Sequence, residues 1–339
     1  MRCTVWLLTA FFFFITTTAH AQSKKIIQEK ARQRFGYYWF FDRGVMSERG
    51  TMSCGQCHRP EKEFGYSNGQ AIAVGGVGVP GNGLGLLGIR NPIGLLNVGD
   101  RLDDEMNWDG RNKGLYKMCL QAVADPLVLG ISIEEAVART ARSKFYQDLA
   151  ELGYGSRDIT EGRIRDSLVF FMKMLSYKGL PADQSAAGLK TGMPASFYRG
   201  EKVFMFNCAV CHQPENDWQD NEYHDIGIAL RSRNNDRVRG RVTGNTEDDF
   251  KVRTPSLRGV PHTPPYMHDG SIETLDEVIG LFARGGAFVR PNGDIQRSRR
   301  MDKFVTAIRM NKQECTDLKV YMTLGFQGDK YPYYPNPHK

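Results

Sequence analysis

The first strong hydrophobic feature of the chain is an apolar run from Val5 to Ile15, directly after a positively charged start. Small residues end the run, and Ala19-His20-Ala21 then forms an A-x-A cleavage pattern. This order of segments is typical of a secretory signal peptide. The eleven residues of the run would span only about half of a roughly 30 Å hydrocarbon core, so a retained membrane anchor is the weaker alternative. We predict that residues 1–21 are removed and that the protein is exported to the periplasm.

Beyond this leader, apolar positions recur in several segments at the spacing of one helix face. In one of them, Ser132 followed by Glu134 and Glu135 has the start signals of a capped helix. Residues 75–88 are rich in glycine and predict a loop. Strand-like alternation is nowhere convincing, so the pattern predicts a mostly α fold with long loops. We expect helices at residues 26–35, 132–152, 164–175, 195–206, 275–282 and 314–324.

The length that remains after the leader, 339 − 21 = 318 residues, suits two domains of ordinary size. Hydrophobic residues make up 41% of the chain and charged residues 24%, which is typical of a soluble globular protein. Residues 179–194 contain two prolines and three glycines and look like an interdomain linker. We therefore predict an N-terminal domain at 22–180, a linker at 181–194 and a C-terminal domain at 195–339.

The charge balance is mildly basic, with 45 Lys and Arg against 38 Asp and Glu and a net charge of +7. No Lys- or Arg-rich helix stands out as a nucleic-acid reader, so nucleic acid is not expected as a partner. The positive charge is either a solvated surface with a small bias or an aid to docking an acidic protein partner.

Cysteine brings in the chemistry. Four of the seven cysteines form two copies of one pattern, Cys54-Gly55-Gln56-Cys57-His58 and Cys208-Ala209-Val210-Cys211-His212. In a C-x-x-C-H motif the two thiols add to the haem vinyl groups and the histidine binds the iron. A zinc site would need four ligands that converge on one metal, whereas the motifs are 208 − 54 = 154 positions apart. We predict two covalent c-type haems, with His58 and His212 as proximal ligands.

Two cysteines of the mature chain, Cys119 and Cys315, are left over. They are either buried inert thiols or a disulfide, which an oxidising compartment would permit. The sequence does not place them within bonding distance of each other.

Five ordered motifs add a family resemblance. They are TMSCGQCHRPEKEFG around the first haem motif, IRNPIGLLN from Ile89, WDGR at Trp108 to Arg111, the second C-x-x-C-H motif, and FKVRTPSLRGV with PPYMHDGSIETLDEVI from Phe250. In this order, and over residues 35 to 324, the chain resembles the bacterial dihaem cytochrome c peroxidase family, which includes the MauG-type enzymes. The resemblance implies two cytochrome c-like haem domains.

The same resemblance implies roles for individual residues. The haem at His58 would react with peroxide, and the haem at His212 would store and relay electrons. Trp108 would be an electron relay between them, although a packed core aromatic is the simpler interpretation. The family also places a calcium ion between the haems, and the matching positions here are the side chain of Asn91 and the backbone carbonyls of Arg253 and Pro255. A simple asparagine turn is the alternative.

The chain departs from the family pattern beside the first haem. Downstream of WDGR the family has a glutamine and a glutamate over the reactive haem, and the acid helps to break the O–O bond. The matching positions are Met118 and Val128, which cannot accept a proton. Gln121 and Asp125 could substitute only if the loop is rearranged. Residues 64–97 contain no histidine, so no imidazole from this loop blocks the reactive face, as in the MauG type.

A second departure concerns the other haem. The family supplies a methionine or tyrosine as sixth iron ligand at a position that is Phe282 here. Either this iron is five-coordinate or another residue reaches it. The possible sixth ligands are Met267, Met301 and Met310, with His224 and His268 as further options. Helix methionines are more often core residues than ligands.

Three functions follow from the resemblance and the departures. The first is a peroxidase that reduces hydrogen peroxide with electrons from a small redox protein, either a cytochrome c or a copper protein. The second is a MauG-type oxidase that uses peroxide to modify a partner protein. The third is an electron carrier or haem sensor without enzymatic activity. The first is the prediction, and the other two are its alternatives.

Overall fold

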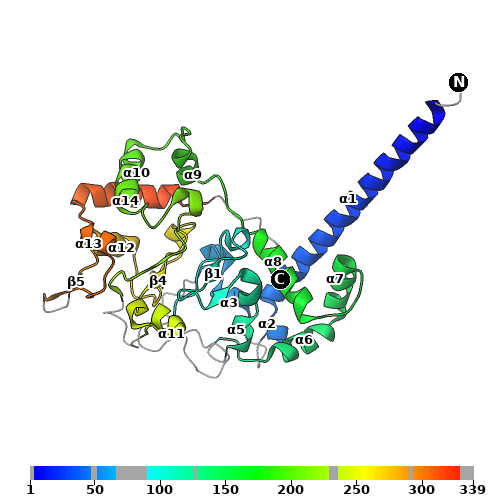
Figure 1. Ribbon diagram of the computed structural model, residues 1–339, viewed down its shortest axis with the longest axis horizontal. Helices are drawn as coiled ribbons and strands as arrows, with labels where there is room; N and C mark the ends of the chain where they lie inside the picture. Colours follow the sequence, from blue (N-terminus) through cyan, green and yellow to red (C-terminus); the bar gives the residue numbers. More distant parts are fainter. Residues whose placement is uncertain are drawn as a thin grey trace.

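The computed structural model describes residues 4–46, 52–65, 90–125, 128–228, 236–289 and 293–328, with the backbone alone at 4–20, 288–289 and 295–296. Residues 75–88, predicted as a loop, lie outside these ranges. Figure 1 shows a mostly helical chain from which one long helix projects. The helices are α1 Thr4–Phe41, α2 Arg43–Met46, α3 Cys54–Cys57, α4 Leu115–Met118, α5 Gln121–Ala124, α6 Ile133–Ala141, α7 Lys144–Tyr154, α8 Glu161–Lys173, α9 Pro181–Ala186, α10 Ala195–Asn207, α11 Arg239–Thr243, α12 Leu275–Ala283, α13 Lys303–Ala307 and α14 Lys312–Gly325.

Strands have a minor part in this fold. β1 Glu105–Met106 pairs antiparallel with β2 Asn112–Lys113, β3 Tyr223–His224 with β4 Val252–Arg253, and β5 Phe288–Val289 with β6 Ile295–Gln296. Each pair holds a loop in place and none is a layer of the fold. The prediction of a mostly α fold with long loops is therefore confirmed.

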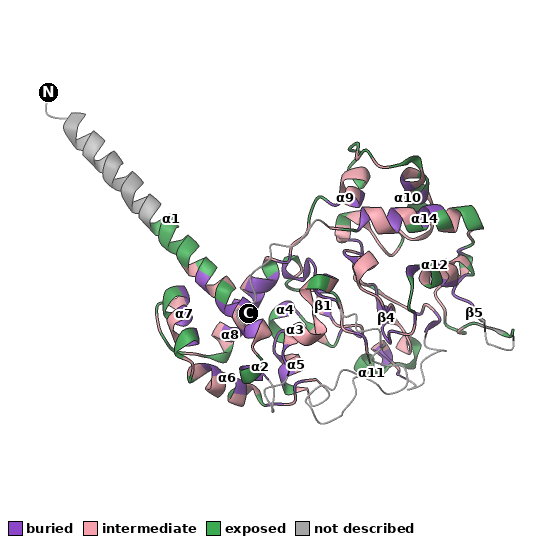
Figure 2. Cartoon of the chain, turned by 180° about the vertical axis from the view of Figure 1, so that it is seen from behind, coloured by how far each residue is buried: buried purple, intermediate pink, exposed green. Residues whose placement is uncertain are grey.

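The first half is organised around the second part of α1, which packs against α7 and α8. Residues 21–30 of α1 are largely exposed, whereas Phe35, Trp39 and Phe40 are fully buried, a change that Figure 2 shows along the helix. Gly36 permits this close packing, because a side chain there would overlap the backbone carbonyl of Ser167 on α8. The buried cluster of this half draws on residues from 35 to 175.

The second half repeats this arrangement with α10 and α14. Their packing depends on Gly200, where a side chain would overlap the backbone carbonyl of Asp317. Phe197, Phe204 and Tyr321 fill the contact as fully buried aromatic rings. The second buried cluster draws on residues from 180 to 326.

Three predicted segments differ from the structure in detail. The helix expected at 132–152 is two helices, because Ser143 is extended and ends α6 before α7 begins. The segment predicted as a linker contains α9, which packs on α14. Ala182 of α9 and Leu180, directly before it, belong to the second cluster. The helix expected at 26–35 belongs to the longer α1, which continues through the predicted cleavage site at Ala21. The signal peptide and the domain limits stay predictions.

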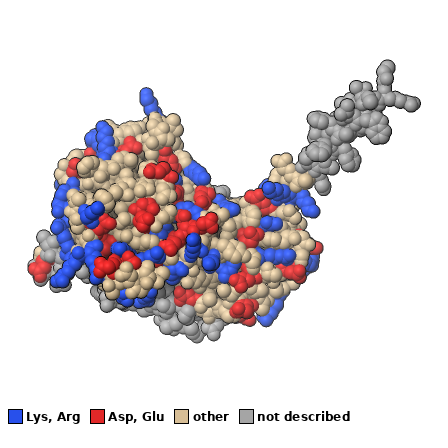
Figure 3. Space-filling model, in the orientation of Figure 1, with Lys and Arg blue, Asp and Glu red and all other residues tan. Residues whose placement is uncertain are grey.

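Over the described ranges, no helix combines the length and the apolar character that a membrane span needs. On the face in Figure 3, Lys and Arg side chains are interspersed with Asp and Glu. On this face the net positive charge is thus spread out and does not form one basic stripe.

Candidate functional site

The first C-x-x-C-H motif begins on the single turn of α3. Ser53 precedes the turn, and its backbone N–H donates to Gln56 Oε1 at 2.7 Å, which fixes the start of the motif. Burial raises the pKa of the Cys54 thiol to about 12 and that of Cys57 to about 11, so both are neutral thiols before haem attachment. His58 Nδ1 lies 3.0 Å from the carbonyl oxygen of Phe64. This contact sets the tautomer and leaves Nε2 as the ring nitrogen for a metal.

The second motif has the same local geometry. It follows directly on α10, and burial raises the pKa of the Cys208 thiol to about 12. His212 Nδ1 lies 2.9 Å from the carbonyl oxygen of Trp218, and burial lowers the pKa of this imidazole. A neutral imidazole with one nitrogen on a carbonyl has its other nitrogen available to bind iron.

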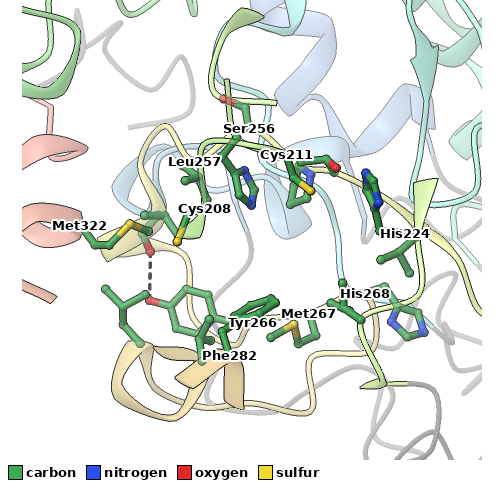
Figure 4. A pocket seen from close by; sticks show the side chains of 18 of the residues that line it. Cys208, Cys211, His224, Ser256, Leu257, Tyr266, Met267, His268, Phe282 and Met322 are labelled. Carbon is green, nitrogen blue, oxygen red and sulfur yellow. Dashed lines mark hydrogen bonds between the residues drawn. The ribbon is translucent and has the colours of Figure 1, made fainter. Parts of the chain in front are cut away.

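A cavity opens beside the second motif, lined mainly by apolar side chains (Figure 4). Cys208, Cys211 and His212 form part of its wall, and Tyr266, Met267 and Phe282 form another part. An apolar cavity with two thiols and an imidazole at its wall suits a haem, which is a large apolar ring that needs these three groups. The residues present therefore fit the predicted group.

Most residues predicted to lie between the two haems, or to reach the second iron as its sixth ligand, also line this cavity. They are Asn91, Trp108, Arg253, Pro255, Met267, Met310, His224 and His268. Met301 instead packs beside Gly227 and Gly286. His224 has both ring nitrogens at 2.8 Å from carboxylates, Nε2 from Asp220 and Nδ1 from Asp302, so neither nitrogen is available to the iron.

Trp108 joins the two halves. Its indole Nε1 donates to the backbone carbonyl of Asn91 at 2.7 Å, and its own carbonyl accepts from the backbone N–H of Arg253 at 2.8 Å. Its ring centroid is 6.5 Å from that of His268, in an edge-to-face arrangement. The indole is thus held firmly, as both the relay and the packing interpretation require.

Asn91, whose carbonyl accepts from Trp108, is itself hydrogen-bonded to the second half. Its side-chain nitrogen donates to the carbonyl of Pro265 at 2.6 Å and to that of Met267 at 3.3 Å. In the part of the chain that the structure describes, its Oδ1 is buried and has no hydrogen-bond partner. A buried oxygen without a donor is a reasonable ligand atom for a hard cation such as calcium.

The predicted apolar departure beside the first motif is visible in the packing. Met118 and Val128 both pack against the first buried cluster. Gln121 accepts a hydrogen bond from the side chain of Asn112, and Asp125 follows the last turn of α5. Gln121 therefore lies at the start of α5 and Asp125 just after its end, and both already take part in hydrogen bonds with neighbouring residues.

Two further features are the thiols outside the haem motifs and a cluster of three side chains beside Cys211. Cys119 is buried in the first cluster, Cys315 packs on the second, and both are free thiols, so the disulfide alternative is not formed. Cys211, Asp220 and His224 come close enough to hold a metal ion. Attachment of haem would convert the Cys211 thiol to a thioether, so this group is better explained as part of the haem surroundings.

Comparison with known proteins agrees with this geometry. A family model described as di-haem cytochrome c peroxidase matches residues 30–191. Methylamine utilization protein MauG of Methylorubrum extorquens is 30% identical over 286 residues, covering 82% of this chain and 75% of the relative. Cytochrome c551 peroxidase of Nitrosomonas europaea is 27% identical and covers 74% of this chain and 72% of the relative.

Two solved structures share the fold. A MauG-like protein associated with microbial copper homeostasis has a TM-score of 0.73 at 23% identity, covering 87% of this chain and 89% of its own. The diheme peroxidase BthA from Burkholderia thailandensis has a TM-score of 0.71 at 20% identity, covering 88% and 86%. At these identities the likeness concerns the fold.

Two haem motifs on two helical halves define a dihaem c-type cytochrome. The chain belongs to the di-haem cytochrome c peroxidase family. It is accordingly a peroxidase-type oxidoreductase whose cofactors are two c-type haems.

Proposed function

We propose that this protein reduces hydrogen peroxide in the periplasm with electrons from a small redox protein, a cytochrome c or a copper protein. In each turnover, two donor proteins each give up one electron, and two protons join one peroxide to form two waters. The observation that carries the proposal is Trp108, a residue of the first half that lines the cavity of the second motif. It supplies a fixed aromatic group between an electron entry site and a reaction site.

The haem-binding residues are assigned by motif. Cys54, Cys57 and His58 would hold the haem of the first half, and Cys208, Cys211 and His212 that of the second. When bound, the first haem supplies the iron at which peroxide is reduced, and the second supplies an electron store. The carbonyls of Phe64 and Trp218 keep the two imidazoles in one tautomer and orientation. The domains would be 22–180 and 195–339, with α9 of the linker packed on the second.

Further residues complete the proposed site. A calcium ion would bind Asn91 Oδ1 and the carbonyl oxygens of Arg253 and Pro255. It would thereby connect the two segments to which Trp108 is hydrogen-bonded. Met267, Met310 and His268 line the second cavity, and they are the remaining candidates for its sixth ligand. Met118 and Val128 would make proton delivery to peroxide slow.

A second candidate is favoured by the relatives. Two MauG proteins, of Methylorubrum extorquens and Methylophilus methylotrophus, are each 30% identical to this chain. The oxidised protein would then take its electrons from side chains of a protein substrate. The apolar surroundings of Met118 and Val128 are compatible with this function as well. An enzyme that modifies a protein substrate does not require fast turnover of peroxide in the absence of that substrate.

The test uses the protein with both haems. The reduced protein is mixed with a reduced small cytochrome and with peroxide, and absorption is followed by stopped flow. The cytochrome should be oxidised in proportion to the peroxide consumed. Trp108→Phe should slow electron transfer between the haems, whereas Trp39→Phe, a substitution in the first buried cluster, should not. A haem-loaded protein that oxidises no donor with peroxide would rule out the peroxidase. Oxidation that proceeds only with a partner protein would support the MauG-type function.

A further inference from the structure

Two arginines at the wall of the second cavity have unused hydrogen-bond donors. Arg253 is 3% exposed, and the side chain of Arg101 is 10% exposed. Both line the cavity that contains the second C-x-x-C-H motif. Among the described residues, Arg253 Nε and Arg101 Nε and Nη1 are buried and have no hydrogen-bond partner. Buried donors of this kind usually point to a ligand or an ion.

The charge of Arg253 is also not balanced. Its Nη1 donates to two neutral oxygens, Gln219 Oε1 at 2.6 Å and Asn221 Oδ1 at 3.3 Å. Across the described segments, no carboxylate lies within 4.0 Å of this guanidinium. Burial, and then the nearby charge of Arg101, lower the pKa of Arg253 to about 10, so it is still a cation at neutral pH.

The charge of Arg101 is only partly balanced, by one carboxylate that it shares with other residues. Its Nε is 3.5 Å from Asp217 Oδ2, which is an ion-pair distance and not a hydrogen bond. The other oxygen of Asp217 already accepts from Arg258 and from Asn97.

A neighbouring arginine shows what a satisfied site looks like in this protein. Arg258 donates two hydrogen bonds to Asp183, at 2.7 and 3.0 Å, and a third to Asp217. An unpaired buried charge costs several kcal/mol even after relaxation of the protein. The fold has built this pairing for Arg258 and has not built it for Arg253, although the two lie on the wall of one cavity.

We propose that Arg101 and Arg253 form an anion site that binds the propionate carboxylates of the haem at the second motif. The inference rests on the proposed haem attachment at Cys208 and Cys211. The vinyl edge of the ring is used by the two thiols, and the two carboxylates are the charged groups that the same ring brings into an otherwise apolar cavity. Arg can bind a carboxylate through two parallel hydrogen bonds.

The position of this pair gives it a functional consequence. The backbone N–H of Arg253 donates to the carbonyl of Trp108, so the pair lies beside the proposed electron path. Positive charge near the propionates favours the reduced iron and raises the reduction potential of this haem. The two arginines therefore act as positioning and tuning residues for the electron store.

The test compares Arg253→Met, Arg253→Lys and Arg101→Met in protein that carries both haems. Redox titration should show a lower potential for one haem in both methionine variants, and Arg253→Lys should recover most of the difference. The haem signal that weakens or disappears in Cys211→Ala identifies the C-terminal haem. The propionate bending band of the resonance Raman spectrum should shift in the same variants. Arg237→Met is the matched control, because Arg237 is a half-exposed arginine that pairs with Asp249 at 2.7 Å.

Unchanged potentials and unchanged propionate bands in both methionine variants, at two haems per chain, would overturn the assignment. A wild-type potential that shifts with added chloride or phosphate, with no change in the propionate band of the variants, would show that a free anion occupies the site and would also overturn it. If a methionine variant loses haem, the Raman band of Arg253→Lys decides. Peroxide turnover is measured on the same samples, so failure of the peroxidase function is distinguishable from failure of the anion site.

Discussion

The segments Cys54–Phe64 and Cys208–Trp218 are two versions of one structure. In each, the C-x-x-C-H motif is followed by a 3-10 helix that starts with proline, η1 Pro60–Lys62 in the first and η3 Pro214–Asn216 in the second. Two residues in the left-handed region then turn the chain back, with φ of 52° and 54° in the first half and 57° and 61° in the second. The turn brings the sixth residue after the histidine into contact with Nδ1 in both halves.

The main helix pair of each half is also built alike. Gly36 allows α1 to approach α8, and Gly200 allows α10 to approach α14. The chain therefore repeats both the helix pair and the proximal side of the haem site.

The surroundings differ between the halves. Phe64 lies among Phe40 and Phe171 in an aromatic cluster. Its counterpart Trp218 donates its indole N–H to Asp183 at 2.8 Å, and Arg258 joins the same carboxylate. The motif and the turn after it therefore determine the proximal side of each haem site. Residues far away in the sequence determine how polar the surroundings of that side are. Chemical differences between the two haems should follow from these distant residues.

The largest effect should come from removing an attachment thiol. Cys57→Ala and Cys211→Ala should each weaken or lose one haem attachment and so lower the covalent haem count below two, because at most one thioether is left to hold that haem. Haem staining after denaturing electrophoresis and a pyridine haemochrome assay measure the count. Cys315→Ala, which changes a free thiol outside both motifs, should keep two haems. A wild-type count of zero or one would contradict the assignment of both motifs.

The next effect concerns the reactive side of the first half. Val128→Glu introduces the acid that the family pattern has at this position, and should raise peroxide turnover by up to about 10⁴-fold. The reason is that cleavage of the O–O bond requires a proton on the leaving oxygen, which valine cannot deliver. Val128→Gln is the control with similar shape and no acid. A fast wild-type enzyme whose rate does not respond to position 128 would show that Gln121, Asp125 or water already delivers the proton.

The sequence predicted the elements whose signals are local. The helices at 164–175, 195–206 and 275–282 follow from their apolar spacing, and Ser132 caps its helix by accepting from the backbone N–H of Glu135 at 3.1 Å. The break between α6 and α7 at Ser143 was not predicted, because a single serine within an amphipathic pattern does not indicate that its backbone is extended. The same holds for α9, whose helical turn is stabilised by packing on α14.

Site prediction has the same limit. The haem motifs are contiguous in sequence, so both were found directly. The burial and the unused donors of Arg101 and Arg253 were not predicted, because they depend on contacts with residues distant in the sequence, such as that between Arg101 and Asp217. Met301 was a candidate ligand from its residue type alone, and its position beside Gly286 removes it from the cavity wall.

A smaller effect is expected at the second cavity. Phe282 lines it and has no donor atom, so wild type should lack the charge-transfer band of methionine bound to iron, unless Met267 or Met310 reaches the iron. Phe282→Met should introduce that band and a low-spin signal in the absorption and electron paramagnetic resonance spectra. Phe304→Met, at another apolar position on the same wall, should not. A wild-type spectrum that already shows the band would identify one of the two lining methionines as the ligand.

The smallest effect concerns pH, which two histidines of the second half should sense differently. Burial lowers the pKa of His224, but hydrogen bonds with Asp220, Cys211 and Asp302 outweigh it and raise the pKa from 6.5 to about 11. Haem attachment removes the part that comes from the Cys211 thiol, so the two aspartates set the rise in the mature protein. His262, also in the second half, lies 3.6 Å from Glu63 of the first half, and burial lowers the pKa of His262.

Because the folded-state pKa of His224 is above its unfolded value, its contribution to stability is full below about pH 6.5 and is lost as the pH rises toward the folded-state pKa. Each pH unit in this window removes at most about 1.4 kcal/mol. The free energy of unfolding in guanidinium should thus fall more steeply from pH 6.5 to 9 in wild type than in His224→Gln. His262→Gln should keep the wild-type slope, since this imidazole is neutral over the same range. Equal slopes in wild type and His224→Gln would show that His224 is not protonated between its two carboxylates.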